Sequence, residues 1–355
     1  MPIEIIRLLA FEGPNVRGPQ PGVLLELRAG RDRSKRLRAA LKDAAQSVGV
    51  VIGYLDVGGA PEGEGFVIRA SFTTPTPAIG AAVAGYVVDG LNARDAGDEE
   101  WDAEGPLWDL QKRRRAEATP LVALQLAAEA AARGVPAFVR ADGALQLGYG
   151  ARGWALEAAA LRPGTTSILA AGDVGVGPPP LARPAEALAV PWERLGPVPI
   201  IAVAGGAGRA AAVRLVADEL RARGLRVASS ADAGFDATRA LLADPAAESV
   251  VVGLEPGDLL RRGLAFEVCA RSAVLGLPEQ LPPEAAGPAE LARALGIPML
   301  VTDPGGLAVL GADTPEVAAL AEYAPCRVAL ARAPGGDADA LGELAARAIL
   351  GQAEL

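Results

Sequence analysis

The sequence contains no histidine. Histidine titrates near neutral pH and is the commonest zinc ligand, so its absence excludes His-dependent catalytic triads and His-containing zinc sites. The two cysteines, Cys269 and Cys326, lie far apart and neither has a metal-ligand spacing, so we expect no disulfide framework and no metal site. Carboxylates, lysine and tyrosine remain as candidate catalytic groups.

Long apolar runs and an excess of positive charge are also missing. Although 51% of the residues are apolar, no run approaches the roughly 18–20 residues that cross a bilayer. The formal net charge is −9 and only 4% of the residues are aromatic, which argues against phosphate neutralisation and base stacking. The first residues lack the basic segment and apolar stretch of a secretory signal. We expect a cytoplasmic protein that binds neither nucleic acid nor a membrane.

The chain of 355 residues is long enough for two domains. Its first part alternates strand and helix patterns and closes in a hairpin at Phe138–Leu147, whereas Gly172–Pro199 is dominated by Gly, Pro and Ala, which sustain neither helix nor central strand. Strands then alternate with helices, a pattern typical of a doubly wound, mostly parallel sheet. We predict an α/β protein with a small α+β domain at residues 1–170, a linker at 171–197 and a second domain at 198–355.

Local patterns predict some elements in detail. Amphipathic periodicity indicates a helix from Ser34 to Ala45, and an apolar stretch after Pro77 indicates a helix over 78–91. Apolar runs predict strands at 50–57 and 299–302. Thr119 before Pro120 is typical of a helix N-cap.

A glycine-rich loop follows the apolar strand at 198–204 and precedes a helix at 209–223; its glycines are Gly205, Gly206 and Gly208. A phosphate-binding loop at such a place cradles phosphates with backbone N–H groups, a lysine and a magnesium-holding hydroxyl. Here Arg209 stands at the lysine position and Ala210 at the hydroxyl position. The loop is either a tight turn that needs glycine or a residual anion or nucleotide site.

Six segments carry distinctive motifs: Glu12–Asn15, Gly134–Gly150, Thr165–Ile168, Pro199–Arg209, Leu259–Phe266 and Ala308–Pro315. They include the Gly-Pro-Asn after the first strand, the Leu-Gln-Leu-Gly-Tyr-Gly run, the strand with its glycine loop, and the Leu-Leu-Arg-Arg-Gly segment. All six are similar to motifs of the cyanophycin synthetase family. The resemblance implies the family's N-terminal domain followed by a degenerate Mur-ligase-like P-loop domain, without the ATP-grasp domain and the C-terminal Mur lobe.

The departures from the family pattern bear on activity. By alignment with the family, a magnesium-binding acid falls on Gly253, an asparagine on Gly276, a histidine on Gln280 and a second asparagine on Gly311. Together with the changed loop, these replacements leave little to stabilise the charge of an acyl-phosphate-forming transition state.

A basic stretch opens the first predicted helix and consists of Arg31, Arg33, Lys35, Arg36, Arg38 and Lys42. Such a charge run is typical of a solvated helix face. The resemblance suggests an alternative, because the family's N-terminal domain holds a growing peptide with a polyaspartate backbone, and arginine binds carboxylates bidentately.

Two functions follow from these observations. The first is a non-catalytic binding, scaffolding or regulatory protein without a cofactor, which docks on itself as a homo-oligomer, on a ligase partner or on a charged peptide. The alternative is an ATP-dependent amide ligase that binds ATP and magnesium through Arg209 and Glu255 in a drifted site, or through a site completed by a partner.

Overall fold

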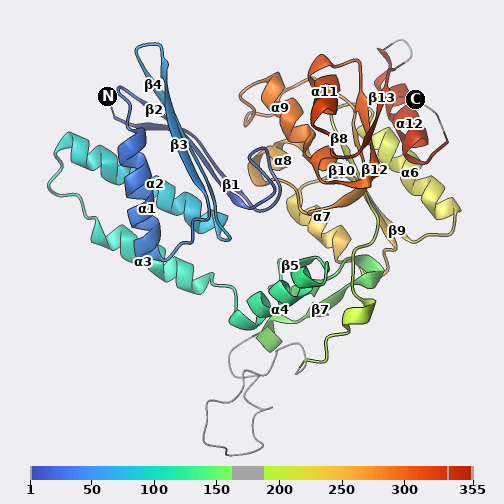
Figure 1. Cartoon of the computed structure of the whole chain (residues 1–355), viewed down its shortest axis with the longest axis horizontal. Helices are drawn as coiled ribbons and strands as arrows, with labels where there is room; N and C mark the ends of the chain where they lie inside the picture. The colour runs from blue at the N-terminus through green and yellow to red at the C-terminus, as the bar shows by residue number, and fades with distance from the viewer. Residues whose placement is uncertain (1, 162–187, 334–335, 353–355) are drawn as a thin grey trace, which may run out of the picture. The chain divides into compact units, whose positions relative to one another are not determined.

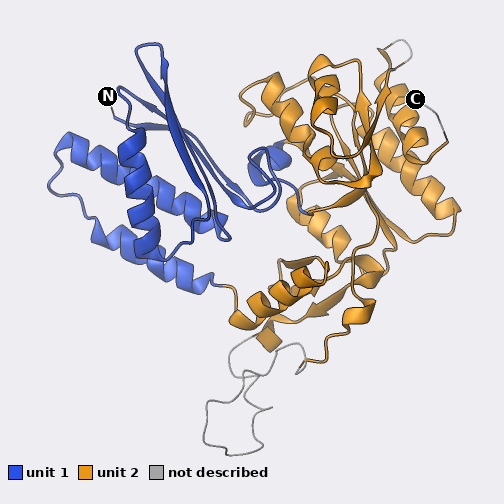
Figure 2. Ribbon diagram, viewed as in Figure 1, with its two compact units in different colours: residues 1–118, 257–266 blue, residues 119–256, 267–355 orange. Residues whose placement is uncertain are grey.

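The computed structural model describes residues 2–161, 188–333 and 336–352. The chain divides into two compact units, of which unit 1 comprises Met1–Ala118 with Gly257–Phe266 and unit 2 comprises Thr119–Pro256 with Glu267–Leu355 (Figure 2). None of the helices in the described ranges is both long and apolar enough to cross a membrane.

Unit 1 is built on a four-stranded antiparallel sheet with the strand order β1-β2-β4-β3. Its strands are β1 (Glu4–Phe11), β2 (Gly22–Ala29), β3 (Leu55–Glu62) and β4 (Gly65–Thr73), and its longer helices are α1 (Ser34–Val48), α2 (Pro77–Ala96) and α3 (Glu104–Ala116). Alternate residues of β2 such as Leu25 and Leu27 enter one core with α1 and α2. On the opposite face, the buried carboxylate of Glu26 pairs with Arg7 at 3.0 Å and Arg69 at 2.7 Å.

Two of the motifs that resemble cyanophycin synthetase meet within unit 1. The side chain of Asn15 donates to the carbonyls of Gly13 and Gln20, which shapes the loop after β1. Helix α8 (Pro256–Arg262) and the residues after it bind that loop, since Leu264 N–H donates to the Pro14 carbonyl at 2.7 Å. Glu12 also pairs with Arg262 at 2.6 Å. The two motifs are therefore structural partners.

Unit 2 begins with helix α4 (Leu121–Ala132) and the three-stranded antiparallel sheet of β5 (Ala137–Val139), β6 (Leu145–Leu147) and β7 (Trp154–Leu156). Leu126, Leu145 and Leu147 form its core with Val190 and Leu195.

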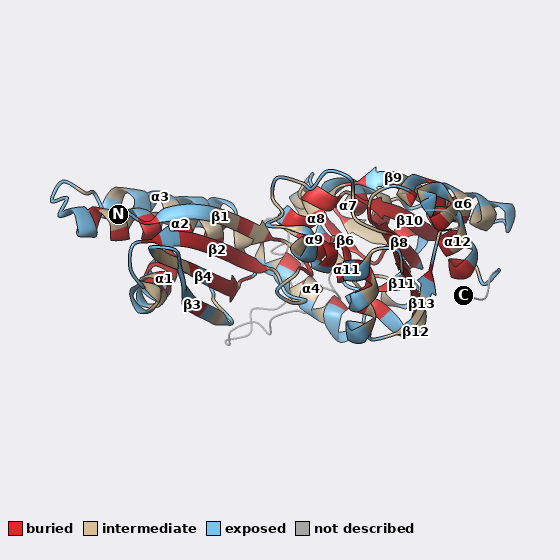
Figure 3. Cartoon of the chain, turned by 90° about the horizontal axis from the view of Figure 1, so that it is seen from above, coloured by how far each residue is buried: buried red, intermediate tan, exposed pale blue. Residues whose placement is uncertain are grey.

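The main body of unit 2 is a six-stranded sheet with the order β13-β12-β11-β8-β10-β9, and each neighbouring pair is parallel (Figure 1). Its strands are β8 (Ile200–Ala204), β9 (Val227–Ala233), β10 (Ser249–Leu254), β11 (Cys269–Val274), β12 (Thr302–Gly311) and β13 (Arg327–Ala331). Fully apolar strands such as β8 are buried on both faces, as Figure 3 shows in red.

Helices cover both faces of this sheet. One face packs against α6 (Arg209–Ala222) and α12 (Ala338–Ile349). The other contacts α7 (Phe235–Leu242), α10 (Ile297–Leu300) and α11 (Pro315–Ala318), and α9 (Pro288–Leu295) packs on α10 and α11. The predicted α/β class with a doubly wound parallel sheet is confirmed.

Several local predictions hold and others are wrong. Helices α1, α2 and α6 and the β5–β6 hairpin lie where the sequence predicts them. The strand predicted at 50–57 begins only at Leu55, because Val50 N–H closes the end of α1 on the Ala45 carbonyl. The strand predicted at 299–302 is instead the end of α10, followed by β12. Pro120 takes the N-cap position expected for Thr119.

The compact units also divide the chain differently from the predicted boundaries. Residues 119–161, which the sequence assigns to the first domain, group with unit 2 because Tyr149 N–H donates to the Gly196 carbonyl at 2.9 Å and Ala151 N–H to the Ala247 carbonyl at 2.7 Å. Within the predicted linker, Val190 and Leu195 are core residues. The rest of that linker, residues 171–187, and the segment Thr165–Ile168 lie outside the described residues.

Candidate functional site

The glycine loop lies at the carboxyl edge of the parallel sheet, directly after β8. Strand β8 lies between β10 and β11. The connection after β8 leads to β9 on one side and the connection after β11 leads to β12 on the other, so the switch point where open α/β sheets bind ligands lies between β8 and β11. The structure brings three of the replaced family positions to the same edge. Gly253 lies in β10, Gly276 follows β11 by two residues, and Gly311 ends β12, whereas Gln280 is exposed farther along the chain.

The loop is shaped by glycine and filled by its own chain. Gly205 has φ 125° and Gly208 has φ 83°, conformations that side-chain-bearing residues rarely adopt. Gly206 N–H donates to the Gly276 carbonyl at 3.0 Å, and a Cβ on Gly206 would lie 2.6 Å from the Cα of Pro278. The segment after β11 therefore lies against the loop, and one N–H of the would-be phosphate cradle already has a partner.

The first turn of α12 closes the loop from another side. A Cβ on Gly208 would lie 2.2 Å from the Ala338 carbonyl oxygen, and a Cβ on Gly342 would lie 2.2 Å from the Gly208 carbonyl oxygen. Asp337 caps α12 by accepting from Asp339 N–H at 2.9 Å. The contact between α6 and α12 thus requires glycine on both sides.

Arg209 does not extend toward an open phosphate site. Its Nη1 donates to the carbonyls of Gly205 at 2.9 Å and Leu254 at 2.8 Å, and its Nε donates to the Ala231 carbonyl at 3.1 Å. Its Nη2 pairs with Asp232 at 2.6 Å, and the side chain is 15% exposed. The guanidinium ties together the carboxyl ends of β8, β9 and β10, and a phosphate would have to compete with these acceptors.

Two of the replaced positions cannot hold a side chain on this backbone. A Cβ would lie 2.2 Å from the Ala231 carbonyl oxygen at Gly253 and 2.0 Å from the Leu275 carbonyl oxygen at Gly311. At Gly276 the nearest atom is the Thr314 hydroxyl at 3.3 Å, so a side chain fits there. Within residues 2–161, 188–333 and 336–352, no group of three or more carboxylate or thiol side chains is placed to hold a metal ion.

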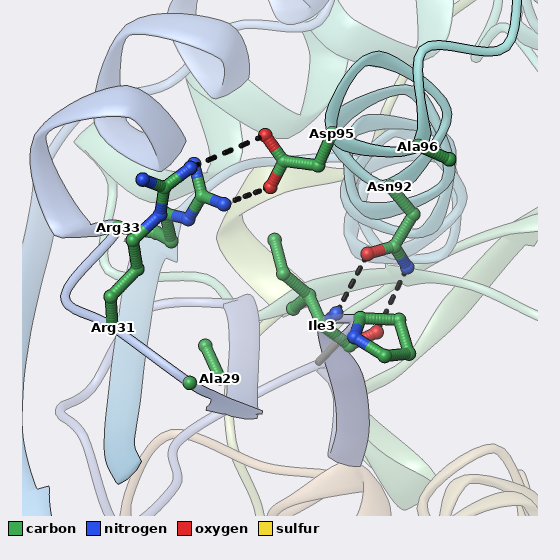
Figure 4. A pocket seen from close by; sticks show the side chains of 9 residues that line it. Ile3, Ala29, Arg31, Arg33, Asn92, Asp95 and Ala96 are labelled. Carbon is green, nitrogen blue, oxygen red and sulfur yellow. Dashed lines mark hydrogen bonds and ion pairs between the residues drawn. The ribbon is translucent and has the colours of Figure 1, made fainter.

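The predicted basic stretch forms a second region, in unit 1. Arg31 and Arg36 lie 3.9 Å and 3.1 Å from the carboxylate of Asp95, and Arg33 is hydrogen-bonded to it. These groups lie beside a cavity of about 520 Å³ that Arg31, Arg33, Asp95 and Asn92 line (Figure 4). Three guanidinium groups share one carboxylate here, so the cavity carries a positive charge excess suited to an anion.

The structure divides the basic stretch by role. Arg38 donates to the carbonyls of Leu55 at 3.0 Å and Val57 at 2.9 Å, so its guanidinium joins β3 to α1. Lys35 and Lys42 are exposed on α1. The sequence missed Asp95, because it lies some sixty residues after the stretch and carries no motif of its own.

The sequence matches the family described as "Domain of unknown function (DUF4938)" over residues 2–170 and 167–330. The chain belongs to the DUF4938 family.

This DUF4938 chain is similar to two curated proteins. It is 33% identical over 154 residues to the cyanophycin synthetase of Synechocystis sp., a match that covers 37% of this chain and 17% of that protein. It is 32% identical over 172 residues to the cyanophycin synthetase of Crocosphaera subtropica, which covers 42% and 19%. The predicted resemblance is confirmed over part of the chain, which spans less than a fifth of the length of either relative.

Two solved structures are more distant. MurF from Acinetobacter baumannii is 17% identical with a TM-score of 0.30, covering 39% of this chain and 32% of that one. A UDP-N-acetylmuramoyl-L-alanyl-D-glutamate–2,6-diaminopimelate ligase is 15% identical with a TM-score of 0.32, covering 42% and 34%.

Proposed function

We propose that this DUF4938 protein is a non-catalytic relative of cyanophycin synthetase, in which the glycine loop is a structural turn and the chain acts by binding. The observation that supports this most directly is the position of Arg209, whose guanidinium is bonded to three carbonyls and one carboxylate of its own unit. Triphosphate binding needs a cation, an oxygen ligand for magnesium and open N–H donors. At this loop the lysine and the hydroxyl are replaced, the arginine that takes the lysine position is already engaged, and the N–H of Gly206 has a partner.

The binding partner that we propose is an acidic peptide, or a ligase that carries one. Self-association of the chain would present several copies of the surface that binds this peptide. The cluster of Arg31, Arg33 and Arg36 around Asp95 supports this, because its excess of guanidinium groups can accept a further carboxylate. Arg31 and Arg36 keep 69% and 48% of their side chains exposed, so an incoming peptide can reach them.

Calorimetry of the full chain with ATP and MgCl₂ tests the first part. We expect no saturable heat at nucleotide concentrations up to about 1 mM. Any Kd is then above about 1 mM, which corresponds to a binding free energy weaker than roughly −4 kcal/mol. Tight, magnesium-dependent binding with ADP release in the presence of an amino acid would instead establish the ligase alternative, with Arg209 and Glu255 in the drifted site.

Titration with tetra-aspartate at low ionic strength tests the second part. Replacing both Arg31 and Arg36 by glutamate should weaken binding at least tenfold, on the order of 1.4 kcal/mol, because a carboxylate loses its partners. The matched control replaces Lys35 and Lys42 by glutamate; both lie on α1 with Arg36, and the change of charge is the same. Equal losses in the two double variants would show that only net charge matters and would remove the cluster from the proposal.

A further inference from the structure

The described part of unit 2 has a larger cavity, at the sheet edge opposite the glycine loop. This cavity, here called the amino-edge cavity, has a volume of about 920 Å³. It lies where the strands begin, since Ile200 and Cys269 are the first residues of β8 and β11 and line it. Its volume is within the range of about 300–1,000 Å³ that holds small organic ligands. It shares no residue with the loop at the carboxyl edge.

Most of its wall is apolar. Helix α4 and the turn after it contribute alanine, valine and proline, and the strand entry contributes proline, valine and isoleucine. These residues include Ala127, Val135, Pro136, Val198, Pro199 and Ile200. Val268 also lines the cavity and is 57% exposed. Such a wall favours an apolar ligand body through the hydrophobic effect.

Two polar side chains of the wall make no hydrogen bond or ion pair with a described residue. Tyr149 is only 5% exposed, and its hydroxyl makes no hydrogen bond with a residue in the described ranges. The half-buried guanidinium of Arg271 likewise makes no ion pair with a described residue. Among the described residues, neither group belongs to the solvent-excluded polar atoms that lack a partner, so both can reach an acceptor that a ligand brings into the cavity.

The protonation of Tyr149 fits a donor role. Burial raises the pKa of Tyr149, and the nearby carboxylate of Glu267 raises it further, against a smaller opposing effect of Arg239. The phenol therefore keeps its proton at neutral pH and can donate it to an anion. A carboxylate that contacts both Tyr149 and Arg271 would accept from a neutral and a charged donor.

The rim carries both signs of charge. Arg152 and Arg271 are cations, and Glu267 and Asp303 are anions. The two cations balance the two anions, so the rim offers a polyanion such as a nucleotide or an acidic peptide no net attraction. A ligand with an apolar middle, one carboxylate and one ammonium group matches the wall and the rim together.

We propose that the amino-edge cavity binds a short peptide with apolar side chains, its terminal carboxylate accepting from Tyr149 and Arg271 and its ammonium group facing Glu267 and Asp303. A peptide of about three residues supplies all three features. This ligand differs from the acidic peptide proposed for unit 1, so the two proposals stand or fall separately.

Calorimetry of the full chain with trileucine, trileucine amide and triaspartate tests the proposal. Trileucine should bind saturably with a Kd at or below about 1 mM, and the amide and triaspartate should bind at least tenfold more weakly. The unmodified protein serves for all three ligands, so this comparison does not depend on the folding of a variant. The proposal is overturned if trileucine fails to bind, or if the amide or triaspartate binds as tightly.

Two variants then assign the residues. Arg271→Met should weaken trileucine binding at least tenfold, and Tyr149→Phe about fivefold, while both leave binding of the amide nearly unchanged. Arg214→Met, at an exposed position of α6, is the matched control and should bind trileucine like the unmodified chain. Thermal unfolding without ligand checks that each variant folds. If folded Arg271→Met and Tyr149→Phe bind trileucine normally, the assignment is wrong.

Discussion

The two edges of the parallel sheet in unit 2 differ in how their polar groups are satisfied. At the carboxyl edge, the loop has the glycines of a phosphate site, but the N–H of Gly206 and the guanidinium of Arg209 are bonded to the chain itself. At the amino edge, no sequence motif marks a site, yet Tyr149 and Arg271 line a cavity without partners among the described residues. A site can bind a ligand only if its hydrogen-bond donors and acceptors are not already used within the chain. A glycine-rich loop alone does not ensure this.

The largest expected effect concerns restoring a family residue at the carboxyl edge. Gly253→Asp should destabilise unit 2 by about 3–5 kcal/mol, because its Cβ would overlap the Ala231 carbonyl and a carboxylate would be buried. Gly276→Asn is the matched control, since its nearest neighbour is 3.3 Å away, and should cost less than about 1 kcal/mol. Denaturant unfolding monitors both. Equal stability of the two variants would mean that the backbone around Gly253 can move to accommodate a side chain.

The next effect concerns the arginine of the loop. Arg209→Met should destabilise unit 2 by about 2–3 kcal/mol, because it leaves three carbonyls and Asp232 without their donor. Arg214→Met, on the exposed side of the same helix, should change stability by less than about 0.5 kcal/mol. The same unfolding measurement compares them. A neutral Arg209→Met would contradict a structural role for the guanidinium.

A smaller effect is expected at the amino edge. Tyr149→Phe should change the free energy of unfolding of the ligand-free protein by less than about 0.5 kcal/mol, because the hydroxyl makes no hydrogen bond with a described residue and is not among their solvent-excluded polar atoms. Differential scanning calorimetry should report a Tm close to that of the unmodified protein. A clearly lowered Tm would indicate that the hydroxyl is hydrogen-bonded in the free protein.

The smallest effect is chemical. Burial raises the pKa of the Cys269 thiol to about 12, and it also raises the pKa of the less buried Cys326. Since the thiolate is the reactive form, iodoacetamide at pH 8 should label Cys326 first and Cys269 only slowly, with labelling of Cys269 rising as the pH approaches 12. Mass spectrometry of the labelled peptides would measure both rates. Rapid native labelling of Cys269 would mean that the amino-edge cavity exposes and activates this thiol.

Sequence patterns predicted the position of a helix or strand correctly where the preference of neighbouring residues agrees with the packing of the folded chain. The periodicity from Ser34 and the run of glycines before Arg209 each led to the correct helix start, because both patterns extend over only a few neighbouring residues. The apolar run near Met299 was misread as a strand, since short apolar segments have no decisive periodicity.

The candidate sites were less predictable because their side chains bond to residues that are distant in the sequence. The sequence placed Arg209 at a lysine position but could not show that its acceptors come from residues 205, 231, 232 and 254. It grouped Arg38 with Arg31 and Arg36 by spacing, although Arg38 bonds to β3 and the others to Asp95. Each of these partners is distant in the chain.

The sequence by itself determined the absence of histidine chemistry, the α/β alternation and the kinship with cyanophycin synthetase, because these depend on residue identity and local pattern. Only the tertiary structure decided that the glycine loop is closed by Pro278 and α12 and that an open cavity lies at the opposite edge. Whether a polar group is free to bind is a property of its spatial neighbours, and folding brings those neighbours from remote parts of the chain.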